Sequence, residues 1–184
     1  MKQTLKYFLS ALIVMIGSCG EEDPLDSAWA KFEDGLYEDA YTEFSAQVPK
    51  PGAFVGLGWT TLKMPGDSLA ASDRFFGQAV TVATSDTLAD AYAGWAIVAW
   101  AIGDHQSCVQ RANVLIRHKP SYVFGHDRRV TSHDIKCHAA FSLFHLGAYQ
   151  ASSDLAQNLD PAFTGSTDPA TLLDELESLF DLFD

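Results

Sequence analysis

Two apolar stripes at helical spacing flank a glycine in residues 92–120, YAGWAIVAWAIGDHQSCVQRANVLIRHKP. The first stripe consists of Tyr92, Trp95, Ala96 and Ala99, and the second of Cys108, Ala112 and Leu115. Gly103 suits the turn between them, because glycine readily adopts the left-handed backbone conformation that ends many helices. Pro120 cannot continue a helix and marks the end of the second one. The stretch therefore predicts a helical hairpin.

Three other segments place a glycine between two apolar helical stretches in the same way. The four turns are Gly35-Leu36-Tyr37, Gly66-Asp67-Ser68, Gly103-Asp104-His105 and Gly147-Ala148-Tyr149. The other three units carry their small and aromatic residues at matching positions: Ala28, Phe32, Tyr37, Ala40 and Phe44; Phe54, Leu57, Gly58, Ala71 and Phe75; Ala139, Ala140, Leu143, Tyr149, Ser152 and Ala156. Internal repetition of this kind predicts an array of similar structural units.

The pattern resembles the tetratricopeptide repeat (TPR), in which a small residue such as Ala96 allows the two helices of a hairpin to approach closely. The turn glycines, at positions 35, 66, 103 and 147, are 31, 37 and 44 residues apart, whereas the family repeats every 34 residues. The units are therefore degenerate. The resemblance implies an all-α fold, an α-α superhelix of about four TPR-like hairpins spanning residues 25–164.

The longest spacing contains an insertion between Pro120 and Asp134, which includes YVFGHDRRV at residues 122–130. Insertions in repeat arrays often project from one face and carry function. We expect the 121–133 loop to be a functional feature, with a plain spacer or an extended helix as the alternatives.

Residues 165–184 predict a C-terminal amphipathic helix, with Asp168 at its start. Its apolar face would hold Leu172, Leu173, Leu176, Leu179, Phe180 and Phe183, with Asp174, Glu175, Glu177, Asp181 and Asp184 turned away. Repeat arrays need a polar-backed terminal helix to cover their last apolar surface. We expect a capping helix, and a partner-binding tail is the alternative.

The first 18 residues have the features of a secretory leader, with Lys2 and Lys6 before an apolar stretch at residues 7–16. This stretch is too short to span a bilayer, which takes about 20 residues. The leader ends in Ile16-Gly17-Ser18-Cys19, which resembles the lipobox of bacterial lipoproteins. The resemblance implies lipidation of Cys19, followed by an acidic tether over residues 19–24. An ordinary signal peptide cut near Gly17 or Gly20 is the alternative.

By the same resemblance, Gly20 after the cysteine favours the outer membrane, because an aspartate there retains many lipoproteins at the inner membrane. We therefore expect a lipid-anchored protein of the cell envelope. The acidic run at residues 21–23 resembles the surface-export tether of some lipoproteins, and a solvated linker of the same composition is the simpler interpretation.

Charge and motifs limit the classes of function. Twelve Lys and Arg face 24 Asp and Glu, a net charge of −12, and loss of the two leader lysines gives 10 − 24 = −14. Nucleic acid and anionic lipid surfaces are poor partners for such a chain. The sequence contains no glycine-rich phosphate loop, nucleophile elbow or zinc-protease motif. We expect no enzymatic activity and no cofactor.

Histidine and cysteine suggest a metal site only superficially. His133 and Cys137 share one helical face and Asp134 and His138 another, about 100° away, so a helix cannot aim all four at one ion. We expect no metal site. Cys108 and Cys137 could form a disulfide or remain as thiols.

In TPR arrays the first helices of successive hairpins line a concave groove in which peptides bind. The register implies a partner-binding groove lined by Trp29, Phe32, Trp59, Leu62, Ile97, Trp100, Phe141, Phe144 and His145. So many aromatic side chains are typical of protein interfaces, although a tightly curled array could instead bury them against one another or under the C-terminal helix. We expect an interaction or scaffold module for a peptide or protein partner. The alternative is a carrier or sensor of a small apolar ligand or metal ion near the 121–133 loop.

Overall fold

A computed structural model describes residues 23–66 and 68–181 of the chain, and within them the regular structure is helical apart from one isolated bridge between Val123 and Thr131. The predicted leader, Cys19 and most of the tether lie outside these residues. The first helices of the four hairpins are α2 (Pro24–Glu33), α4 (Pro51–Lys63), α6 (Ser85–Ala101) and α8 (Ser132–His145). The second helices are α3 (Tyr37–Ala46), α5 (Leu69–Val82), α7 (His105–His118) and α9 (Tyr149–Gln157), and α10 (Pro169–Asp181) follows. Within residues 23–66 and 68–181, no helix combines the length and the hydropathy that a membrane span requires.

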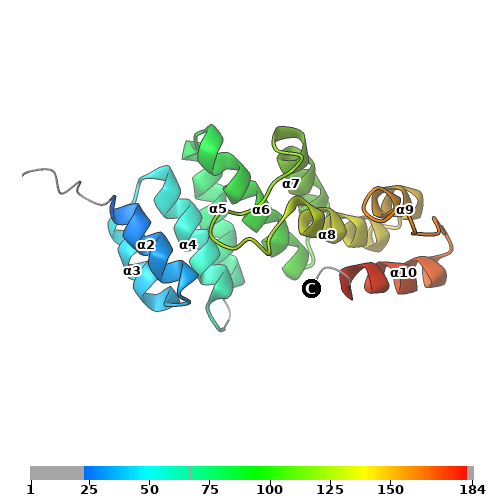
Figure 1. Ribbon diagram of the computed structural model, residues 1–184, viewed down its shortest axis with the longest axis horizontal. Coiled ribbons are helices and arrows are strands. Elements are labelled where there is room, and N and C mark those ends of the chain that lie inside the picture. The colour runs from blue at the N-terminus through cyan, green and yellow to red at the C-terminus, as the bar shows by residue number, and fades with distance from the viewer. Residues whose placement is uncertain (1–22, 67, 182–184) are drawn as a thin grey trace, which may run out of the picture.

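The hairpins stack side by side into an elongated superhelix (Figure 1). Backbones of consecutive first helices approach one another closely, whereas those of consecutive second helices in the described part of the chain do not. The first helices therefore line the inner side of the curve, which we call the concave face. The all-α superhelix of helical hairpins predicted from the repeats is confirmed.

All four predicted turn glycines adopt the left-handed conformation. Their φ angles are 77° at Gly35, 105° at Gly66, 77° at Gly103 and 74° at Gly147. A side chain strains this region of backbone space, so glycine is the residue that reverses the chain here at least cost. These glycines therefore mark where each hairpin reverses.

A buried ring occupies the contact between the second and third hairpins. Phe76 of α5 is fully buried, and its ring lies against the backbone of Gly58 in α4 and Gly94 in α6. A Cβ atom added at Gly94 would lie 2.1 Å from the ring, closer than van der Waals contact allows. Glycine at both positions gives the ring its space between two helices.

Gly94→Ala is therefore expected to destabilise the protein by roughly 1–3 kcal/mol through overpacking. Gly77→Ala is the matched control, because its Cβ would meet Trp95 at 3.5 Å, an ordinary contact. That change should stabilise α5 by about 0.5–1 kcal/mol. Urea unfolding of both variants measures the two effects, and equal free energies of unfolding would contradict this packing.

The C-terminal helix α10 packs on α8 and α9. Asp168 caps it, because the Asp168 carboxylate accepts a hydrogen bond from the Thr171 backbone N–H at 3.1 Å. Leu172, Leu176 and Leu179 are buried, and Leu173 and Phe180 are half-buried. Phe183 and Asp184 of the predicted helix lie outside the described residues. The apolar face of α10 covers the last hairpin, as a terminal helix of a repeat array must.

Candidate functional site

The inserted segment between α7 and α8 lies on the concave face. We call residues 119–131 the strap. It runs from α7 across α6 toward α4 and back to α8 (Figure 1), and its side chains contact α6, α4 and α2. The insertion therefore does not project into solvent as insertions in repeat arrays often do, because its aromatic side chains are buried in the groove.

Strap side chains alternate between the groove and solvent. Tyr122 and Phe124 are buried and His126 is half-buried, whereas Ser121, Val123 and Gly125 are exposed. The Phe124 N–H donates to the Val130 carbonyl at 2.9 Å, and the Ser132 N–H donates to the Tyr122 carbonyl at 2.8 Å. A period of two residues is the signature of extended backbone, so residues 122–124 lie in the groove as a short extended segment, and turns at 125–126 and 128–129 return the chain toward α8.

Phe124 sits at the centre of an aromatic cluster. Its side chain is 0% exposed and stacks on Trp59 with ring centroids 4.3 Å apart and an 18° interplanar angle. Trp29 and Phe32 of α2 approach it edge-on at 5.9 and 6.2 Å. Offset-stacked and edge-to-face pairs are the favourable arrangements of aromatic rings. One strap residue thus joins the first two hairpins.

A polar contact holds the base of the strap to α6. The Tyr122 hydroxyl donates to the Asp90 carboxylate at 2.9 Å, and the Trp59 indole N–H donates to the Asp90 carbonyl at 3.2 Å. Burial raises the pKa of the Asp90 carboxyl group and of the Tyr122 hydroxyl. A buried carboxylate without a partner is costly, so Asp90 and Tyr122 depend on each other.

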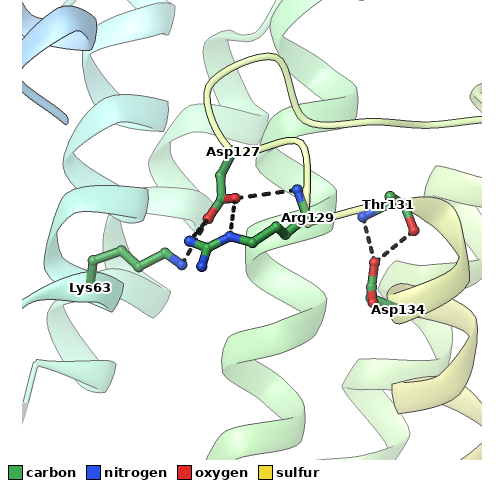
Figure 2. Close-up of polar contacts among 5 residues, drawn as sticks. All are labelled: Lys63, Asp127, Arg129, Thr131 and Asp134. Carbon is green, nitrogen blue, oxygen red and sulfur yellow. Dashed lines mark hydrogen bonds and ion pairs between the residues drawn. The ribbon is translucent and has the colours of Figure 1, made fainter. Parts of the chain in front are cut away.

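The tip of the strap is held by charged and aromatic groups. The His126 ring lies parallel to Trp29 at 3.8 Å, and its Nδ1 atom is 2.7 Å from a Glu33 carboxylate oxygen. The Asp127 carboxylate accepts from the Lys63 ammonium at 3.1 Å (Figure 2). Each of these contacts bridges the strap to a first helix of the array.

Asp127 also accepts from the Arg129 guanidinium at 2.9 Å. The hydrogen bond from Arg129, and then that from Lys63, lower the pKa of Asp127 from 3.8 to about 2. Because the folded-state pKa is the lower one, this contact stabilises the protein above pH 3.8, and the contribution disappears as the pH falls toward 2. The tip therefore stays ion-paired at neutral pH.

The strap ends in the cap of α8. The Thr131 side chain accepts from the His133 N–H at 3.1 Å. The Asp134 carboxylate accepts from the Thr131 N–H at 2.6 Å (Figure 2). This reciprocal capping box satisfies backbone donors at the start of a helix. His138 Nδ1 is 2.6 Å from the Asp134 carbonyl oxygen on the same helix. The rings of His126 and His138 thus have structural partners.

A second aromatic cluster forms where α10 meets the concave face. Phe180 stacks on Trp100 with ring centroids 5.8 Å apart and meets Phe141 edge-on at 5.2 Å. His138 lies edge-on to Trp100 at 4.5 Å. The terminal helix therefore covers this end of the groove, as the strap covers the other.

The nine groove residues predicted from the repeat register do not share one environment. Some lie under the strap, and others lie near α10 or at the end of α8. Phe32 and Trp59 are buried under the strap, where Trp29 also lies with part of its ring exposed. Trp100 and Phe141 lie under Phe180, while Phe144 contacts Tyr149 and His145 stacks on His105. Leu62, Ile97, Trp100, Phe141 and Phe144 are half-buried, and His145 is exposed. For Phe32 and Trp59 the self-buried alternative holds.

Sequence reasoning missed the residues that fill the groove. Tyr122, Phe124 and His126 come from the insertion, and Phe180 was expected only as part of a cap. The alternation of large and small residues from Ser121 to His126 was the available signal, since it is typical of a chain with one face buried.

Buried thiols and scattered acidic groups do not form a metal centre in the described part of the chain. Residues 23–66 and 68–181 contain no group of three or more His, Cys, Asp or Glu that could hold an ion. Cys108 and Cys137 are both buried and both free, so the two cysteines are not paired.

Both thiols are expected to resist alkylation in the folded protein. Burial raises the pKa of Cys137 to about 12 and also raises the pKa of Cys108, and the thiolate is the reactive form. In a Cys19→Ser variant, iodoacetamide at pH 8 should therefore label neither cysteine natively and both in guanidinium chloride, as counted by intact mass. Rapid native labelling would show that the hairpins holding these cysteines open readily.

Comparison with known proteins supports the fold but does not assign a family or a function. No family model matches the chain, and no curated protein matches its sequence. A solved structure described as MamA MSR-1 C2, a TPR-containing protein, superposes with a TM-score of 0.61 at 10% identity, covering 85% of this chain and 94% of that one. At this identity the likeness shows the fold alone, which is a TPR-like helical repeat.

Proposed function

We propose that this protein is a membrane-anchored interaction module of the bacterial cell envelope, without catalytic activity, that binds a peptide or protein partner on its concave face. A TPR-like superhelix supports partner binding in general. The observation that carries the proposal is the strap itself, because the concave face holds this peptide segment through aromatic stacking and matched polar groups. A surface that binds one such segment has the chemistry to bind another.

The proposed partner site comprises the concave positions that keep exposed area. Trp29, Leu62, Ile97 and Trp100 are half-buried and come from three consecutive first helices. Partly exposed aromatic and aliphatic side chains on a rigid scaffold are typical anchors of protein interfaces. Phe141, Phe144 and His145 extend this surface onto α8.

Anchoring rests on the sequence before the described residues. The lipobox-like Ile16-Gly17-Ser18-Cys19 supports lipidation, and each buried methylene of an attached chain contributes about 0.8 kcal/mol to membrane binding. Asp23 caps α2, accepting from the Leu25 N–H at 3.0 Å. The folded array therefore begins within a few residues of the proposed anchor, which would keep the module close to the membrane. Gly20 after the cysteine favours the outer membrane as its location.

Photo-crosslinking in the native host tests partner binding. A photoreactive phenylalanine analogue is placed at Leu62 or Ile97 on the concave face, and at Gln110 on α7 as the matched control on the opposite side. The concave positions should give a defined crosslinked polypeptide and position 110 should not. Absence of adducts from both concave positions, or identical adducts from all three, would overturn the proposed site.

A further inference from the structure

The strap occupies the concave face in the manner of a bound peptide. Its residues 122–124 are extended, with alternate side chains in the groove, and turns at 125–126 and 128–129 reverse the chain at the tip. The strap contacts the first helices of three consecutive hairpins. Its hydrogen bonds to other backbone groups connect it mainly to itself and to the start of α8, as with Phe124 to Val130 and Ser132 to Tyr122. It is therefore attached to the groove through side chains, as a ligand would be.

Each groove contact selects a side-chain type at one strap position. Asp90 accepts from a hydroxyl at Tyr122, and the Trp59 ring stacks on an aromatic ring at Phe124. Glu33 and Trp29 together favour a cationic or imidazole group two positions later, because a cation is attracted both to a carboxylate and to the face of an indole. Lys63 then pairs with an acidic residue.

We propose that the strap is a resident competitor for this groove, and that the partner presents a segment with two aromatic residues two positions apart in extended backbone, followed across a turn by a basic or histidine residue and an acidic one. This inference rests on the proposed function. It adds the chemistry of the partner segment and the control of partner binding by the strap. The proposed site then extends from the exposed concave positions onto those that the strap covers. Binding at the covered positions requires the strap to leave the groove, so the apparent affinity falls in proportion to the small fraction of molecules with an open groove.

The tip is the part of the strap from which opening would start. His126 and Asp127 are only partly buried, and Arg129 is exposed, with 85% of its side chain accessible. Phe124 and Tyr122 lie deeper. Loosening the tip should therefore raise the population with an open groove while the helices keep their packing.

The experiment uses the synthetic peptide KPSYVFGHDRRVT, residues 119–131, carrying a fluorescent label. Its binding to the full chain is measured by fluorescence anisotropy for the wild type and for a His126→Ala/Asp127→Asn variant. The variant should bind the peptide at least about tenfold more tightly, because more of its molecules have an open groove. A scrambled peptide should not bind. The protein variant Val123→Ser, which changes an outward strap position, should bind the labelled peptide with the affinity of the wild-type protein.

A groove variant checks where the peptide binds. Adding Glu33→Ala and Lys63→Ala to the loosened background should abolish the gain in affinity, because both groups that hold the tip are then missing. If the peptide binds neither protein, or binds the wild type and the loosened variant equally, the strap is not a competitor and the inference is wrong.

Hydrogen exchange of the wild-type protein gives a second measurement that needs no variant. The Phe124 amide, which donates to the Val130 carbonyl, and the Ser132 amide, which donates to the Tyr122 carbonyl, should exchange through a local opening faster than amides at the centres of α6 and α8. Exchange of all these amides only by global unfolding would overturn the inference. If the loosened variant binds the labelled peptide more tightly but no partner is crosslinked in the host, the proposed function is wrong and the strap mechanism stands. If a partner is crosslinked but the two proteins bind the peptide equally, the strap mechanism is wrong and the proposed function stands.

Discussion

Trp59→Ala is expected to lower the free energy of unfolding by about 3–5 kcal/mol, the usual cost of truncating a buried aromatic residue to alanine. Trp59 is 1% exposed, stacks on Phe124, meets Phe76 edge-on at 5.7 Å and donates its indole N–H to the Asp90 carbonyl. Removing the ring leaves a cavity between α4, α5 and the strap. In a thermal melt followed by circular dichroism, the midpoint should fall by about 6–20 °C.

Leu36→Ala is the matched control, because that side chain is apolar but 51% exposed in the turn between α2 and α3. It should change the free energy of unfolding by no more than about 0.5 kcal/mol. A Trp59→Ala protein that melts like the wild type would mean that Trp59 faces an open groove and that the strap does not cover it.

Cys19→Ser should abolish both lipid labelling and membrane association. Lipoprotein maturation attaches a diacylglyceryl group to the cysteine thiol, and serine provides no thiol to accept it. Cells grown with a radioactive fatty acid and expressing the variant should contain no labelled protein, whereas the wild type should be labelled. Unchanged labelling or an unchanged membrane fraction would exclude Cys19 as the anchor.

Two further changes separate the anchor from its destination. Ser18→Ala keeps a small residue before the cysteine, so labelling should persist at the wild-type level. Gly20→Asp introduces the residue that retains many lipoproteins at the inner membrane, so on a density gradient the labelled protein should move from the outer-membrane to the inner-membrane fraction. A labelled wild type that is already in the inner-membrane fraction would contradict the proposed location.

The hairpins could be predicted from sequence because their determinants are local. Gly103 and the apolar residues on either side of it lie within one unit, and a left-handed glycine followed by a capped helix leaves little choice of topology. Asp104 supplies that cap, accepting from the Ser107 N–H at 3.1 Å. Each unit can therefore be recognised without knowledge of its neighbours.

The filling of the groove could not be predicted in the same way, because it depends on contacts between distant parts of the chain. The repeat register correctly places Trp59 on a first helix, but it contains no information on what covers that helix. The covering residue, Phe124, lies in an insertion that has no counterpart in the repeat. Phe180 likewise reaches Trp100 from beyond the last hairpin.

The strap also changes how the array should unfold. In a simple repeat array each unit interacts only with its neighbours, so terminal units can fray independently and folding resembles a one-dimensional chain of coupled elements. Here His126 meets Glu33, 93 positions earlier, and Asp127 meets Lys63, 64 positions earlier. These contacts couple the first hairpin directly to the junction between the third and fourth, so the N-terminal three hairpins should melt as one cooperative unit, and fraying should begin at α10.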